Sequence, residues 1–172
     1  MLLASGFIPE PKERVLTAFI TPEGLSRCEA VHYEIRQVDD AHGVEDLAEV
    51  SRDIGRENVG EEARRLLATL RDHPDTLRAY VAYVDGAPVA CARLHFADTQ
   101  PIAWLAGGRT KTAHRKRGLY TALVRRRFED ALARGCVALV VDALPTSEPI
   151  LVKRGFRPIS DKQAFVLPNT PA

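Results

Sequence analysis

Basic residues gather in one short stretch of the chain, immediately before a predicted helix. Eight of the 24 lysines and arginines fall between Arg109 and Arg127, and five of these precede Gly118. A helix start presents unpaired backbone N–H groups and a partial positive charge, and a glycine lets an anion approach the main chain. We therefore expect this stretch to bind a phosphate or a similar anion. It is neither a Walker loop nor a Rossmann loop, because Gly-Lys-Ser/Thr and Gly-x-Gly-x-x-Gly are both absent.

Two further features upstream of the basic stretch could take part in chemistry. Gly107 and Gly108 end a predicted strand, where paired glycines indicate a bulge whose free N–H groups can stabilise a developing oxyanion. His95, on the neighbouring predicted strand, is a candidate general base. The alternative for His95 is an outward-facing or hydrogen-bonded strand histidine. Trp104 could line a substrate pocket or belong to the core.

The predicted elements alternate between strand and helix periodicity from residue 31 onward. Asp85-Gly86 predicts a tight hairpin turn, and His73-Pro74 predicts a helix end. The expected order is β-α-α-β-β-β-α-β-α-β-(β), with one central β-α-β unit. This order predicts an α/β (mixed α+β) fold, with a mixed, mostly antiparallel sheet and helices on both faces. The predicted strands are 31–36, 79–84, 88–96, 102–106, 136–141, about 159 and 164–167, and the helices are 44–54, 61–72, 118–135 and 145–153.

The segment RKRGLY at Arg115–Tyr120 resembles the Arg/Gln-x-x-Gly-x-Gly/Ala motif of the GCN5-related N-acetyltransferases. The segment SEPILVKRGFRPI at 147–159 is similar to that family's short helix and Gly-Phe strand. With the order of elements, the resemblance covers roughly residues 31 to 167. It implies a loop whose backbone amides bind the pyrophosphate of acetyl-coenzyme A, without a metal. The cofactor-binding residues it implies are Arg109, Thr110, Lys111, Thr112, Arg115, Lys116, Arg117, Gly118, Leu119, Tyr120, Thr121 and Ser147.

The sequence departs from the family pattern at two positions. Tyr120 stands where the loop motif has glycine or alanine. Leu151 stands where the family often has a tyrosine that protonates the departing thiolate, and leucine has no proton to give. Ser147 is the nearest hydroxyl in the sequence, so Ser147 and His95 are the two candidate catalytic residues. A thiol with a pKa near about 8.5 could also leave with little assistance.

The resemblance implies an acetyl-coenzyme A-dependent N-acetyltransferase that moves an acetyl group directly to a primary amine of a small-molecule acceptor, whose identity the sequence does not specify. The alternative is an acyl-coenzyme A-binding module or sensor without turnover, which the missing tyrosine favours. A third hypothesis is a nucleic-acid binder using the basic stretch. The net charge of +1 and the absence of interleaved aromatic residues argue against it. Arg125, Arg126 and Arg127 could reach a cofactor phosphate or form a solvent-facing run.

Composition and cysteine content indicate in which cellular compartment the protein is expected to function. No apolar run approaches the roughly 20 residues that a membrane span needs, so no membrane partner is expected. Cys28, Cys91 and Cys136 form no Cys-x-x-Cys pair, which is typical of a reducing cytoplasm. They are expected to be small core residues. Dimers are common in the family, so the resemblance also implies a homodimer.

The first 30 residues are predicted to be an extension to an acetyltransferase domain spanning 31–172. LLASGFIP at 2–9 is similar to LVKRGFRP at 151–158, and each is followed by a short apolar segment. One interpretation is chance. The other is that residues 1–30 are the remnant of a preceding, related half-domain.

Overall fold

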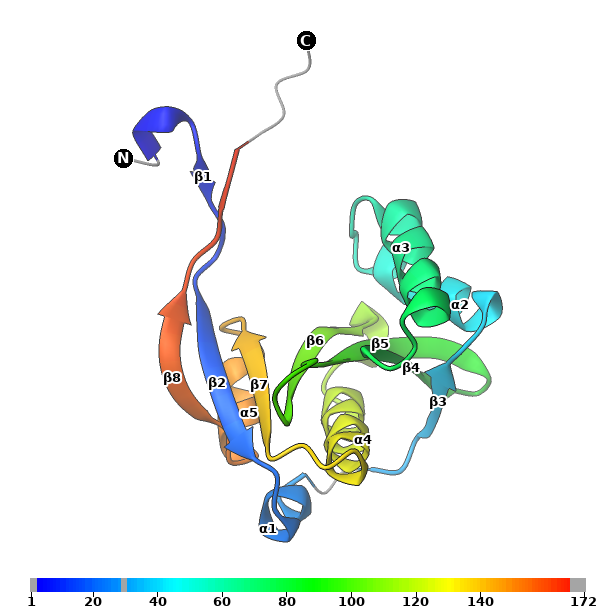
Figure 1. Ribbon diagram of the computed structural model, residues 1–172. Coiled ribbons are helices and arrows are strands. Elements are labelled where there is room, and N and C mark those ends of the chain that lie inside the picture. The colour runs from blue at the N-terminus through cyan, green and yellow to red at the C-terminus, as the bar shows by residue number, and fades with distance from the viewer. Residues whose placement is uncertain (1–2, 29–30, 168–172) are drawn as a thin grey trace.

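The computed structural model describes residues 3–28 and 31–167. Its main feature is one seven-stranded sheet (Figure 1). In spatial order, the strands are β3 (Glu34–Val38), β4 (Leu77–Val84), β5 (Ala87–Phe96), β6 (Ile102–Thr110), β7 (Ala138–Ala143), β2 (Glu13–Phe19) and β8 (Arg157–Lys162). The helices are α1 (Pro22–Ser26), α2 (Ala41–Asp53), α3 (Val59–Asp72), α4 (Leu119–Ala133) and α5 (Glu148–Lys153), with 3-10 turns η1 (Leu3–Ser5) and η2 (Thr112–His114). The part of the chain that the structure describes has no helix long and apolar enough to cross a membrane.

Local sequence explains where several elements begin and end. Asp40 caps α2 by accepting a hydrogen bond from Gly43 N at 2.8 Å. Helix α3 ends at Asp72, just before His73-Pro74. Asp85 and Gly86 both have positive φ, 51° and 78°, as a two-residue hairpin turn between β4 and β5 requires. The predicted helix end at His73-Pro74 and the predicted hairpin turn are confirmed, and α2 begins three residues before the predicted start at 44.

Helices cover the two faces of the sheet unequally. Helices α2 and α3 lie over the β3–β5 side, and α4 crosses the opposite face (Figure 1). Between α2, α3 and the sheet, a core forms around Leu47, Leu66 and Val81. The larger core lies on the α4 side and includes Tyr80, Leu123 and Phe128. The predicted mixed, mostly antiparallel sheet with helices on both faces is therefore confirmed.

Strands β6 and β7 form the central parallel pair, and they diverge along their length. Their register runs from Ile102 opposite Ala138 to Leu105 opposite Val141 and goes no further, although β6 continues to Thr110. Over the continuing part, the register between β5 and β6 shifts between Cys91 and Arg93. Gly107 has φ +57° there. The bulge predicted at the paired glycines is confirmed.

The first long strand lies inside the sheet. Strand β2 pairs antiparallel with both β7 and β8. Beyond the end of the sheet, β1 (Ile8–Pro9) pairs with β9 (Phe165–Val166) as a separate two-stranded ribbon (Figure 1). Residues 13–19 are thus part of the same sheet as the predicted domain 31–172. Their descent from an earlier half-domain stays a hypothesis.

Candidate functional site

The loop before α4 has the shape of an anion cradle. Gly118 precedes the first residue of α4 with φ +88°, and no side chain caps the helix start. Lys116 also adopts a positive φ of 62°, which a residue with a side chain rarely takes. The Tyr33 hydroxyl holds this conformation by donating to the Arg117 carbonyl at 2.6 Å. The N–H groups that open α4 are therefore left without a side-chain partner beside a fixed loop.

The electrostatics of this helix start favour an anion. Arg115, Lys116 and Arg117 are exposed, and the first turn of α4 carries no acidic residue. Arg115 folds back to donate to the Thr110 carbonyl at 3.3 Å, and Arg117 contacts the His114 ring at 3.1 Å. Leu119 and Thr121 point into the protein and are buried. Of the predicted loop residues, those from 115 to 118 are the ones on the surface at the helix start.

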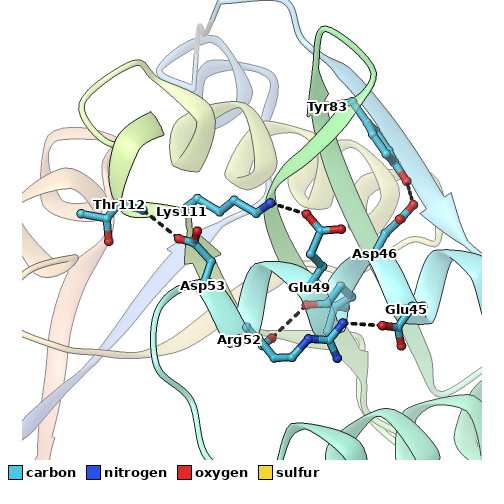
Figure 2. A network of polar contacts seen from close by, with 10 residues as sticks. Glu45, Asp46, Glu49, Arg52, Asp53, Tyr83, Lys111 and Thr112 are labelled. Atoms are coloured by element: carbon cyan, nitrogen blue, oxygen red, sulfur yellow. Dashed lines mark hydrogen bonds and ion pairs between the residues drawn. The ribbon is translucent and has the colours of Figure 1, made fainter.

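Lys111 and Thr112, which precede this loop, turn toward α2 instead (Figure 2). Lys111 Nζ donates to Glu49 at 2.5 Å, and the Thr112 backbone N–H donates to Asp53 at 3.3 Å. Acidic residues on α2 thereby fasten the chain that leaves β6. Glu45, on the same helix, pairs with Arg52.

Arg109 is the centre of a half-buried ion cluster. Its guanidinium donates to both Glu62 carboxylate oxygens at 2.8 Å and to Ser51 Oγ at 2.5 Å. Arg93 Nη2 reaches the same carboxylate at 2.9 Å. Burial works to raise the pKa of Glu62, but Arg109 and Arg93 outweigh it and hold that pKa below its ordinary value. The Arg109 side chain is thus bound to Glu62 on α3. The predicted cofactor contact of Arg109 would therefore be made by its main chain.

Tyr120 bridges the place where β6 and β7 separate. A β-carbon added to Gly108 on β6 would lie 2.7 Å from Tyr120 Cε2, so the ring lies directly over this glycine. Burial raises the pKa of Tyr120, while the neighbouring Arg127 guanidinium and Ser147 hydroxyl act to lower it. Ser147 precedes α5, so the phenol reaches from β6 across to the start of α5. Ser147 itself donates to the Leu144 carbonyl at 3.2 Å.

Arg127 contradicts the sequence-based expectation for the basic run on α4. It is not solvent-facing, since its side chain is 1% exposed within the core. Its Nε donates to the Leu123 carbonyl at 2.9 Å, and its Nη2 has no hydrogen-bond partner among the described residues. Arg125 and Arg126 pair along the helix with Glu129 and Asp130. Helical periodicity places 127 on the apolar face, one turn after Leu123.

His95 lines a cavity of about 280 Å³ between α3 and strands β4 and β5. Burial lowers the pKa of His95, and the Arg93 guanidinium lowers it further, so the imidazole is neutral at pH 7. Its ring nitrogens make no hydrogen bond within the described ranges 3–28 and 31–167. Arg93 also lines this cavity and lies against Gly107, which brings the cavity next to the β6 bulge. His95 and Ser147 lie on opposite faces of the sheet, because Ser147 belongs to the α5 side.

Two remaining residues bear on the site. Leu151, at the position of the family's tyrosine, is fully buried in the larger core, so this position supplies no acid. Trp104 pairs with His95 across the β5–β6 ladder and is 38% exposed. It therefore lies on the same face of the sheet as the cavity. The three cysteines are buried and free, as expected of core residues.

A model of the Acetyltransferase (GNAT) family matches residues 44–156, more than half of the chain, and the chain belongs to this family. No curated protein matches the chain significantly. Among solved structures, a predicted acetyltransferase with acetyl-CoA from Clostridium acetobutylicum is 18% identical. It has a TM-score of 0.62, with 73% of this chain and 90% of that one covered.

Two larger structures extend the similarity to nearly the whole chain. A functionally unknown conserved protein from Staphylococcus epidermidis is 14% identical with a TM-score of 0.70, covering 95% of this chain. A tandem GNAT protein from the clavulanic acid biosynthesis pathway is 15% identical with a TM-score of 0.70, covering 98%. This chain spans only 64% and 58% of those two proteins.

Proposed function

We propose that this chain is an acetyl-coenzyme A-dependent N-acetyltransferase that acetylates a primary amine of a small molecule. The observation that carries the proposal is the start of α4, where exposed Arg115–Arg117 and left-handed Gly118 precede a helix without a side-chain cap. Uncapped N–H groups beside basic side chains fit a pyrophosphate. Family membership and the Clostridium acetobutylicum structure with acetyl-CoA support the same cofactor.

Residues 115–121 would hold the pyrophosphate of the cofactor, and the main chain of 109–112 would hold its arm. When bound, the cofactor supplies an acetyl thioester. The oxyanion that develops at the thioester carbonyl would be stabilised by backbone N–H groups at the β6 bulge, around Gly107 and Gly108. Strand divergence beyond Leu105 and Val141 leaves room for the arm between β6 and β7.

Two side chains would handle the protons of the transfer. His95, neutral at pH 7, takes the proton from the attacking amine, directly or through one water molecule. The N–C bond forms as the C–S bond breaks, and the sulfur leaves with its electron pair. Tyr120, which stays protonated because burial raises its pKa, donates a proton to that sulfur, with Ser147 orienting the phenol. Tyr120 would thereby take over the task of the tyrosine replaced by Leu151.

A non-catalytic acyl-coenzyme A module is the second candidate. Buried Leu151 favours it, because the position that often supplies the acid is part of the core. Transfer of the acetyl group to any amine would exclude this interpretation.

We propose a cytoplasmic location because all three cysteines are buried and free. A homodimer stays a prediction.

Calorimetric titration with acetyl-coenzyme A and with dephospho-coenzyme A tests the cofactor site. We expect the paired Arg115→Ala and Lys116→Ala changes to weaken both ligands at least tenfold, since both ligands contain the pyrophosphate. Paired Arg125→Ala and Arg126→Ala changes remove the same charge further along α4 and serve as the control. Failure of the unmodified protein to bind either ligand would overturn both the enzyme and the sensor proposals.

A further inference from the structure

The cavity beside His95 has a lining whose charges indicate what kind of amine it accepts. Helix α3 contributes Glu61, Glu62 and Arg65, and β5 contributes Arg93 and His95. Leu66 and Leu77 supply an apolar part of the lining. A volume of about 280 Å³ suits a molecule of amino-acid size rather than a polypeptide or a large sugar.

Both carboxylates of this lining are already neutralised by more than one cation. Glu62 accepts from Arg109 and Arg93 at 2.8 and 2.9 Å. Glu61 accepts from Arg64 and Arg65 at 2.5 and 2.7 Å. Four guanidinium groups thus surround two carboxylates, and no unpaired carboxylate faces the cavity within the described part of the chain.

The lining itself holds two carboxylates and two guanidinium groups, and the surplus of positive charge in the cluster comes from Arg64 and Arg109, which pair with the same carboxylates from outside the lining. A polycationic acceptor would find no free acidic partner there and would meet Arg65 and Arg93. An anionic group would find Arg65, whose side chain is 79% exposed and whose planar fork can take a second carboxylate. His95 carries no charge at neutral pH, so it can accept a proton from an amine without repelling it.

We propose that the acceptor is a small amine that also carries a carboxylate. In this arrangement the carboxylate lies toward Arg65 and the amine lies toward His95 and the β6 bulge. The inference deepens the proposed acetyltransferase function and rests on it for the chemistry. The binding preference itself depends only on the cavity and is measurable without the cofactor.

Two ligands that differ in one carboxylate provide the test, L-lysine and its decarboxylated counterpart cadaverine. Saturation-transfer NMR on the full chain measures their binding at millimolar concentration. We expect L-lysine to bind more tightly than cadaverine. Arg65→Gln should weaken L-lysine about fivefold, a size typical of an exposed ion pair. Arg64→Gln is the matched control, because Arg64 pairs with the same Glu61 at the same exposure but does not line the cavity.

Three results would overturn the proposal: equal or tighter binding of cadaverine, no binding of L-lysine, or L-lysine binding that Arg65→Gln leaves unchanged. Acetyl-transfer assays on the same pair then give the KM for each acceptor. Calorimetry with acetyl-coenzyme A distinguishes failure of the cavity assignment from failure of the proposed acetyltransferase function. If L-lysine binds as expected but acetyl-coenzyme A does not, the cavity assignment stands and the proposed function fails.

Discussion

The guanidinium of Arg93 lies directly against Gly107: a β-carbon there would be 2.8 Å from Arg93 Nε and 2.9 Å from Nη2. The β6 bulge, the ion cluster on Glu62 and the cavity beside His95 therefore meet at one contact. Shifting Arg93 would disturb all three.

Gly107→Ala tests that contact. The new methyl group must displace Arg93 from Glu62, and the backbone holds φ +57° in addition. We expect a loss of roughly 1–3 kcal/mol from the backbone alone, plus a further loss from the displaced ion pair. Gly55→Ala is the control, since Gly55 has φ +73° and nothing within 4 Å of an added β-carbon. Urea unfolding compares the two, and equal losses would show that the Arg93 contact contributes nothing.

Glu62→Gln should destabilise the protein by about 2 kcal/mol at pH 7, because it leaves the half-buried Arg109 without its charged partner. The pKa of Glu62 is lowered in the folded state. Its stabilising effect is therefore complete above the ordinary carboxyl pKa and is lost as the pH falls through the folded value. The stability gap between Glu62→Gln and the unmodified protein should shrink from pH 7 to pH 3. A gap independent of pH would contradict this ion cluster.

The acid side of the pH–rate profile should depend on His95. Since burial lowers its pKa, the imidazole loses its role as base only at a pH below its ordinary value of about 6.5. We expect kcat/KM to decline on acidification below that value and His95→Gln to remove this dependence along with most of the rate. His114→Gln, beside the cofactor loop, is the control and should retain the decline of kcat/KM at acidic pH. An unchanged profile in His95→Gln would assign the base to another group.

Tyr120→Phe should lower kcat about a hundredfold while leaving the Kd for acetyl-coenzyme A within a factor of about two. The ring and its packing on Gly108 are retained, and only the proton donor is lost. Ser147→Ala should have a smaller effect, because it removes only a neighbour of the phenol. An unchanged kcat in Tyr120→Phe would mean that the thiolate departs without help.

The sequence predicted those turns, helix ends and loops that are determined by a few neighbouring residues. The Asp85-Gly86 turn, the His73-Pro74 helix end and the loop before Gly118 each depend on a few adjacent residues. The order of elements after residue 31 and the cradle at α4 were predictable for that reason.

Features that depend on distant residues escaped sequence reasoning. Arg109 and Glu62 are 47 positions apart, and no pattern in either segment indicates the other. Arg127 looked like part of an exposed basic run, and only helical phase could have placed it in the core. The bridging position of Tyr120 depends on how β6, α4 and α5 pack. The motif showed that a tyrosine replaces the usual glycine or alanine, but it could not show where the phenol lies.

The place of β2 in the sheet means that this strand is synthesised long before the strands with which it pairs. Thr17 on β2 donates to the carbonyl of Leu139, 122 positions later, and β2 pairs on its other side with β8. At ribosomal rates of about 5–20 residues per second, β2 waits on the order of ten seconds for its first partner strand. During that interval a strand with two open edges exposes Val15, Leu16 and Phe19, which is a hazard for aggregation. The synthesis of β7 and β8 therefore ends the period in which β2 most needs protection.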